Sequence, residues 1–184
     1  WTSLARTRAR ARASEEVNHD LGLTFQYQWA ASERYGFVRH AKLTASKATK
    51  VSMLDGIQNV LPYGVPEGLQ RGSSNLVDAY KKCELEEGNL GIFALSAIIS
   101  DKAEPSEALK ANVVWSIGLD NPKVLLCAKQ VAAFQTGGAV TTETDIKAER
   151  GAYFVQSDFD LAAGETKDWM FATNLGQSIR SVVQ

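Results

Sequence analysis

Apolar and polar residues alternate strictly between Leu21 and Trp29. The odd-numbered positions hold Leu, Leu, Phe, Tyr and Trp, and the even-numbered positions hold Gly, Thr, Gln and Gln. A repeat of two residues is typical of a half-buried β-strand, because successive side chains point to opposite faces of a sheet. We therefore predict a strand over 21–29 whose odd-numbered face, with Leu21 at its start, packs against a core.

The two segments that follow continue the strand pattern. One face of the segment 35–44 carries Phe37, Arg39, Ala41 and Leu43. The segment 50–62 is again rich in apolar residues, and both connections between the three segments are short. Consecutive strands with short connections favour an antiparallel meander, so we expect the three strands to be neighbours in one sheet.

The rest of the chain predicts more strands around one long loop. Segment 62–75 is dense in Gly, Pro and Ser, which predicts a loop, and long loops in compact domains often carry function. A short helix is expected next, with Ser74 or Asn75 as its N-cap and Leu76, Val77 and Tyr80 buried. Further strands are expected at 90–100 and 108–119, in 124–134 leading into a short helix, and three times between 141 and 175, with a tight turn at 162–165. The pattern predicts an all-β fold, an antiparallel sandwich of eight to ten strands with one or two short helices, as a single domain over 1–184.

Composition excludes several classes of protein. The 184 residues include 20 Lys and Arg against 21 Asp and Glu, and 45% of them are hydrophobic. A net charge near zero argues against a dedicated nucleic-acid or anionic-membrane binder, and the apolar content argues against disorder. No apolar run reaches the roughly 18 residues of a membrane helix. Alternating arginines at 6, 8, 10 and 12 form either an edge strand, which the neutral overall charge favours, or an anion-binding arm.

The few cysteines and histidines give no metal or cofactor site. Cys127 follows an apolar run and is expected to be a buried thiol, whereas Cys83 has lysine neighbours that could lower its pKa. His19 and His40 have no second ligand at metal spacing, and neither a Gly-x-Ser-x-Gly elbow nor a phosphate-binding loop is present. We expect two idle thiols, no cofactor, and a cytoplasmic protein, since few cysteines fit a reducing compartment.

Aromatic and acidic residues leave alternatives open. Trp29, Trp115 and Trp169 have apolar neighbours, which favours core packing over a sugar-stacking surface. The polar run Asn18–His19–Asp20 is either a hydrogen-bonded corner or a contact to a sugar or another domain. Acidic residues near turns offer no reason to pair any two as an acid and a base. The chain opens without Met and ends on a helix-like pattern, so we expect it to be a piece of a longer protein.

Two strings resemble a known family. NHDLGLTFQYQWAASERYGFVRHAKLT (18–44) and KVSMLDGIQNVLPYGVP (50–66) resemble the N-terminal β super-sandwich domain of cellobiose phosphorylase-like proteins, whose sandwich is called galactose mutarotase-like. In such domains a strand ending in LTN precedes a strand of the VELLDGLQNILP kind; here these are KLTAS and VSMLDGIQNVLP. Downstream strings such as SNLVDAYK and LAAGET extend the resemblance over most of the chain.

The resemblance implies a supporting role in a carbohydrate-active enzyme. Family members cleave β-glucosidic bonds with phosphate and inversion, and their acidic catalyst and phosphate site lie in a following (α/α)₆ barrel. This chain shows too few helices for that barrel, so no catalytic residue is carried over and the chain alone is expected to be inactive. The expected partners are that helical domain and an oligosaccharide, with a homodimer left open.

The loop after the third strand supplies the candidate site residues. The polar side chains that could border a sugar site or face another domain are Asp55, Gln58, Asn59, Tyr63, Gln70, Arg71 and Asn75. Three alternatives remain. A stand-alone carbohydrate-binding module predicts an exposed tryptophan surface, an oligomerisation domain predicts an apolar patch around 60–80, and a mutarotase-like enzyme predicts a His with a Glu.

Overall fold

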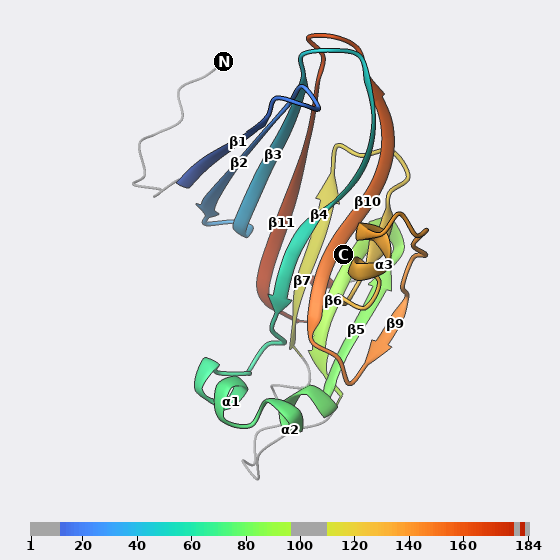
Figure 1. Cartoon of the computed structure of the whole chain (residues 1–184). Coiled ribbons are helices and arrows are strands. Elements are labelled where there is room, and N and C mark those ends of the chain that lie inside the picture. Colours follow the sequence, from blue (N-terminus) through green and yellow to red (C-terminus); the bar gives the residue numbers. More distant parts are fainter. Residues whose placement is uncertain (1–11, 97–109, 179–180, 183–184) are drawn as a thin grey trace.

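The computed structural model describes residues 12–96, 110–178 and 181–182, and they form two antiparallel β-sheets packed as a sandwich (Figure 1). The larger sheet has the strand order β1-β2-β3-β11-β7-β6-β5-β9, and the smaller one has the order β4-β10-β8. The strands are β1 (Arg12–Asn18), β2 (Leu23–Ser32), β3 (Gly36–Ala45), β4 (Thr49–Val60), β5 (Lys81–Glu86), β6 (Leu90–Leu95), β7 (Lys110–Ile117), β8 (Lys123–Leu125), β9 (Asp145–Lys147), β10 (Gly151–Leu161) and β11 (Thr166–Ser178). The predicted all-β sandwich is confirmed.

Short helices fill the connections. They are α1 (Glu67–Gly72), α2 (Ser74–Ala79), α3 (Val131–Gln135) and a 3₁₀ turn (Glu87–Asn89). α2 and α3 lie where helices are expected. α1 lies in the segment predicted as a loop, so the described residues form three α-helices where we expected one or two. Leu76 on α2 is exposed although we expected it to be buried.

The predicted three-strand meander is wrong at its third member. β2 and β3 pair along their whole length, from Leu23 opposite Ala45 to Ser32 opposite Gly36. The other edge of β3 is taken by β11, which comes from far along the chain. β4 therefore crosses to the smaller sheet and pairs with β10. Leu21 also departs from the prediction, because it lies exposed in the turn before β2.

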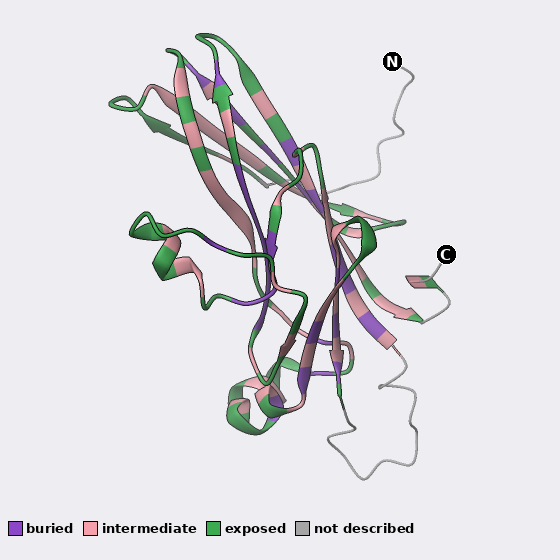
Figure 2. Ribbon diagram, turned by 90° about the vertical axis from the view of Figure 1, so that its right-hand side faces the viewer, coloured by how far each residue is buried: buried purple, intermediate pink, exposed green. Residues whose placement is uncertain are grey.

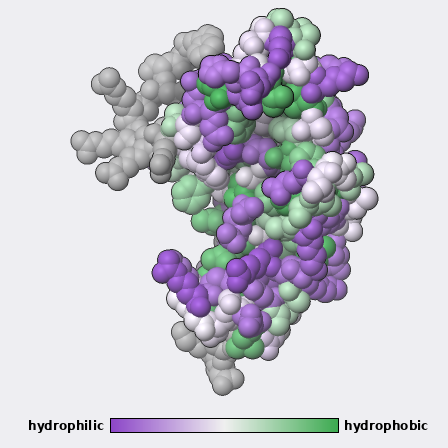
Figure 3. Space-filling view, viewed as in Figure 1, coloured by the Kyte–Doolittle hydropathy of each residue, from purple (hydrophilic) through white to green (hydrophobic). Residues whose placement is uncertain are grey.

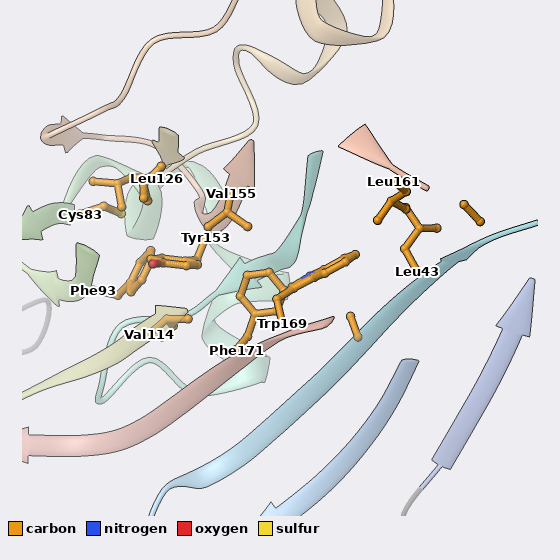
Figure 4. Close-up of a cluster of buried hydrophobic side chains, with 13 residues drawn as sticks. Leu43, Cys83, Phe93, Val114, Leu126, Tyr153, Val155, Leu161, Trp169 and Phe171 are labelled. Carbon is orange, nitrogen blue, oxygen red and sulfur yellow. The ribbon is translucent and has the colours of Figure 1, made fainter. Parts of the chain in front are cut away.

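The core lies where β10 and β11 face each other. Trp169 and Phe171 of β11 and Tyr153 and Val155 of β10 are almost fully buried, and they meet between the sheets (Figure 4). Buried positions follow the facing surfaces of the two sheets, whereas the short helices are mostly exposed or half-buried (Figure 2). Core packing is thus confirmed for Trp169.

Both cysteines are buried and free. Burial raises the pKa of the Cys83 thiol to about 12 and also raises the pKa of Cys127 above its usual value. The lysines beside Cys83 therefore do not activate it, because desolvation of the thiolate outweighs their charge. Burial and a raised pKa are typical of unreactive thiols.

Several expectations fall outside the described residues. These are the arginines at 6, 8 and 10, the second half of the strand predicted at 90–100, positions 108 and 109 at the start of the next predicted strand, and most of the helix-like end. β1 begins at Arg12, the last arginine of the run, and is an edge strand of the larger sheet. For Arg12, this agrees with the interpretation of the run as an edge strand.

Candidate functional site

The segment between β4 and β5 folds back over one end of the sandwich. Val65, Val77 and Leu95 form a small buried cluster, with Leu69 and Tyr80 packed against it. This cluster anchors α1 and α2 to the end of β6, so the polar residues of α1 are held beside the ends of β4 and β10 (Figure 1). A segment rich in Gly and Pro thereby acquires a defined position.

A pocket of about 300 Å³ lies between α1 and the strand ends. Three of the predicted site residues, Asn59, Gln70 and Arg71, line it together. The remaining polar lining comes from Glu67, Lys81 and Arg150, and Val60 and Leu61 provide an apolar wall. We call this site the Lys81 pocket, after its most buried charged residue.

Lys81 is only 2% exposed, and its ammonium group is held by two neighbours. Nζ donates to Gln70 Oε1 at 2.6 Å and to Asp78 Oδ1 at 2.7 Å. Arg150 Nε donates to the other Asp78 oxygen at 3.2 Å, and Gln70 Nε2 donates to Asp78 Oδ1 at 3.3 Å. A buried ammonium group is tolerated only when it is paired and hydrogen-bonded, as it is here.

Asp78 stays ionised within this network. Burial acts to raise the pKa of Asp78, but the hydrogen bonds from Lys81, Arg150 and Gln70 outweigh it, so the pKa lies below its usual value. A general acid needs a raised pKa near the working pH, and Asp78 has the opposite shift. Asp78 therefore serves this network as a hydrogen-bond acceptor and counter-ion rather than as a general acid.

Arg71 forms the outer border of the pocket. Its guanidinium group is 2.7 Å from Glu67, one helical turn earlier on α1, and both side chains are exposed. An exposed ion pair of this kind contributes about 0–1 kcal/mol, so it exchanges readily for another partner. Arg71 can thus turn from Glu67 to a ligand at low cost.

Asp55 lies away from the pocket, inside the sandwich. Its Oδ2 accepts from Arg39 Nη1 at 2.5 Å and from Trp169 Nε1 at 2.7 Å. The side chains of Arg39 and Asp55 are only 7% and 14% exposed. The Arg39 guanidinium also lies 4.8 Å from the centre of the Tyr27 ring. Asp55 therefore joins β4 to β3 and β11 as part of the core.

The other three predicted residues do not line the Lys81 pocket. Gln58 is exposed near the end of β4, and Asn75 is exposed on α2. Tyr63 is half-buried, and its ring packs beside Gly176 and lies 5.0 Å from Lys110 Nζ. The structure thus brings together three of the seven residues.

Sequence reasoning missed Lys81, Asp78 and Arg150 as members of one site. A signal existed for Lys81, because it shares the inward-facing positions of β5 with Cys83, and a lysine among buried positions calls for a partner. Arg150 immediately precedes β10 and gives no such signal. The pairing of Arg150 with Asp78 joins residues 72 positions apart, which only the fold reveals.

The histidines and tryptophans do not build the alternative sites. His40 Nε2 lies 3.1 Å from Asp168 Oδ2, on the outer face of the larger sheet and with an aspartate rather than a glutamate. Within the described ranges, no three His, Cys, Asp or Glu side chains are grouped for a metal ion. Trp29 and Trp115 are half-buried rather than fully buried, and they lie on opposite faces of the larger sheet, so they form no shared surface.

Two further findings complete the description. Among the helices that the structure describes, none has the length and apolar character needed to cross a membrane. The chain matches no protein-family model and none of the curated proteins. The function must therefore be argued from the site itself and from the resemblance of the sequence strings.

Proposed function

We propose that the chain is a non-catalytic domain of a cellobiose phosphorylase-like carbohydrate-active protein and that it binds part of a sugar in the Lys81 pocket. A helical catalytic domain would carry the reacting groups, and this domain would border the sugar site. The observation that carries the proposal is the network of buried Lys81, ionised Asp78 and Gln70 beside an open pocket. The resemblance of segments 18–44 and 50–66 to the sandwich domain of that family supports it independently.

The mixture of donors and acceptors favours a neutral, hydroxyl-rich ligand. Each sugar hydroxyl both donates and accepts a hydrogen bond. Arg71, Arg150 and Asn59 offer donors at the pocket, and Glu67 and the side-chain oxygen of Asn59 offer acceptors. Val60 and Leu61 suit the apolar face of a sugar ring.

The pKa shifts of two aspartates agree with the non-catalytic assignment. Inverting sugar cleavage needs one carboxylic acid with a raised pKa and a second carboxylate about 6.5–9.5 Å away. Hydrogen bonds from Ser52 and Gln156 lower the pKa of Asp158. The pKa of Asp78 is also lowered by hydrogen bonds, although burial acts to raise it. Both shifts run opposite to the requirement for a general acid. We expect no release of glucose 1-phosphate from cellobiose and phosphate by this chain; saturable release by the purified chain would contradict this assignment.

Calorimetric titration of the full chain with cellobiose and with glucose tests the binding. Arg71→Ala and Asn59→Ala each remove one pocket donor, and each should weaken binding by roughly fivefold to tenfold. Lys129→Ala is the matched control for Arg71→Ala, because Lys129 is also an exposed cation paired at 2.7 Å, with Glu149, but outside the pocket. Absence of saturable binding, or equal weakening by Lys129→Ala, contradicts the proposal.

A further inference from the structure

β4 is a long strand with an unpaired edge. It pairs with β10 from Thr49 to Val60, and in the part of the chain that the structure describes no strand pairs with its other side. The other edge strands, β1, β8 and β9, have 7, 3 and 3 residues, whereas β4 has 12. Natural sheets shorten, charge or cover their edges, so a long edge of this kind calls for an explanation.

The edge of β4 borders an aromatic surface on the larger sheet. Phe25, Tyr27 and Trp29 lie on the inner face of β2, opposite Leu43, Ala41 and Arg39 of β3. The inter-sheet bonds of Asp55 on β4 go to β3 and β11 and not to β2. β2 and β1 therefore project beyond the smaller sheet, and they stand to the left of it in Figure 1.

Part of this surface is open. A groove of about 300 Å³ runs beside the end of β4, lined by Trp29, Phe37, Ile57, Val60 and Leu175. Phe37 and Leu175 are more than half exposed, and Trp29 is only half-buried. In the space-filling view, hydrophobic side chains appear beside the notch in the left-hand outline, between β1–β3 and the α1 segment (Figure 3). The groove adjoins the core, because Ile57 and Val60 line it and also pack against the buried core residues.

The unpaired edge of β4 and the apolar groove beside it together favour an extended polypeptide as the ligand. Every second residue of β4 directs its N–H and C=O groups away from β10, and an added strand pairs with the whole of such a row. The 12 residues of β4 span about 40 Å at roughly 3.3 Å per residue, which is too long for one sugar or lipid headgroup. Side chains at alternate positions of an added strand would face Tyr27 and Trp29, so these positions should be apolar.

A second copy of the chain fits this edge poorly. If two β4 strands paired antiparallel about a two-fold axis normal to the sheet, both larger sheets would lie on the same side of the joined smaller sheets. The projecting β1 and β2 strands of the two copies would then occupy the same space. A single extended segment lies beneath β2 without this collision.

We propose that an extended segment of a partner polypeptide, with apolar side chains at every second position, adds to the smaller sheet along β4 and covers Tyr27 and Trp29. The added strand would use the edge of β4 that faces away from β10, and its groove shares Asn59, Val60 and Leu61 with the Lys81 pocket. It converts the three-stranded sheet into a four-stranded one and closes the groove.

A fluorescent ten-residue peptide with Val alternating with Thr and Lys is the probe. We expect saturable anisotropy on titration with the full chain, and slower amide hydrogen exchange along β4 in the complex. Trp29→Ser should weaken binding by roughly tenfold or more, as is common for a buried tryptophan anchor. Trp115→Ser is the matched control, because it removes a half-buried tryptophan from the outer face, and it should leave binding unchanged.

A second peptide keeps the proposal testable if Trp29→Ser fails to fold. The same sequence N-methylated at alternate backbone nitrogens keeps its side chains but cannot pair with a strand edge, so it should lose binding. Equal binding by the methylated peptide would show side-chain adhesion only and would overturn the proposal. So would absence of saturable binding, or concentration-dependent dimers in light scattering with protected β4 amides and no peptide present.

Discussion

Replacing Asp55 by alanine leaves the Arg39 guanidinium inside the sandwich without its counter-ion. Arg39 is only 7% exposed on its side chain, and the same substitution removes the acceptor of the nearly buried Trp169 indole N–H. Breaking one side of a buried ion pair costs about 3–5 kcal/mol, because the remaining charge stays desolvated. The aromatic ring of Tyr27, 4.8 Å from the guanidinium, offsets part of this cost.

We therefore expect Asp55→Ala to lower the free energy of unfolding by about 3–4 kcal/mol, a large share of the roughly 5–15 kcal/mol that stabilises a typical domain. Urea denaturation followed by tryptophan fluorescence and circular dichroism measures it. Asp168→Ala is the control, because that carboxylate is 66% exposed and pairs with the exposed His40, and its loss should cost less than about 1 kcal/mol.

A double-mutant cycle separates the ion pair from general packing. Asp55→Ala combined with Arg39→Met removes both charges, and the double variant should be more stable than the sum of the single changes predicts by about 2 kcal/mol or more. A cost below about 1 kcal/mol for Asp55→Ala, or strict additivity in the cycle, would refute the assignment of Asp55 to the core. Asp55 would then return to the list of candidate sugar contacts.

Three other predictions follow from buried groups. Because burial raises the pKa of Cys83 to about 12, the folded chain should react with iodoacetamide far more slowly than the urea-unfolded chain, as followed by mass spectrometry. The pKa of Asp78 is lowered on folding, so the stability that Asp78 contributes is present above the pKa of the unfolded chain, near 3.8, and is lost as pH falls through the lower pKa of the folded chain. Below about pH 4, the urea midpoint of Asp78→Asn should therefore change less with pH than that of the unmodified chain. A Cβ at Gly56 would lie 2.1 Å from the Tyr153 carbonyl oxygen, so Gly56→Ala should lower the free energy of unfolding by about 3 kcal/mol or more in urea denaturation. Gly68 on α1 has open space around it, so Gly68→Ala should leave the free energy of unfolding unchanged or raise it by up to about 1 kcal/mol.

The parts of the fold that depend on residues close together in the sequence could be predicted from that sequence. The alternation in β2 and its turn into β3 gave the right strands and the right pairing, because both depend on neighbouring residues. The destination of β4 could not be predicted in this way. It depends on β11, more than 100 residues later, taking the second edge of β3, and a strand with apolar residues on both faces is compatible with either sheet.

The candidate site was predictable only in part for the same reason. Gln70 and Arg71 lie in a segment whose glycines and prolines mark a connection, and polar residues in long connections are reasonable candidates. Asp55 was grouped with them because a carboxylate beside a turn is usually solvated. Its partner Arg39 lies on a strand of the other sheet, and no local pattern indicates that the two charges meet.

Amide chemical shifts of the isotope-labelled full chain, recorded during titration with cellobiose, test whether the Lys81 pocket binds a sugar. We expect saturable shifts concentrated at Asn59, Gln70, Arg71, Lys81 and Arg150, with affinity that agrees with calorimetry. No shifts up to the solubility of the sugar, or shifts confined to residues outside this pocket, would contradict it.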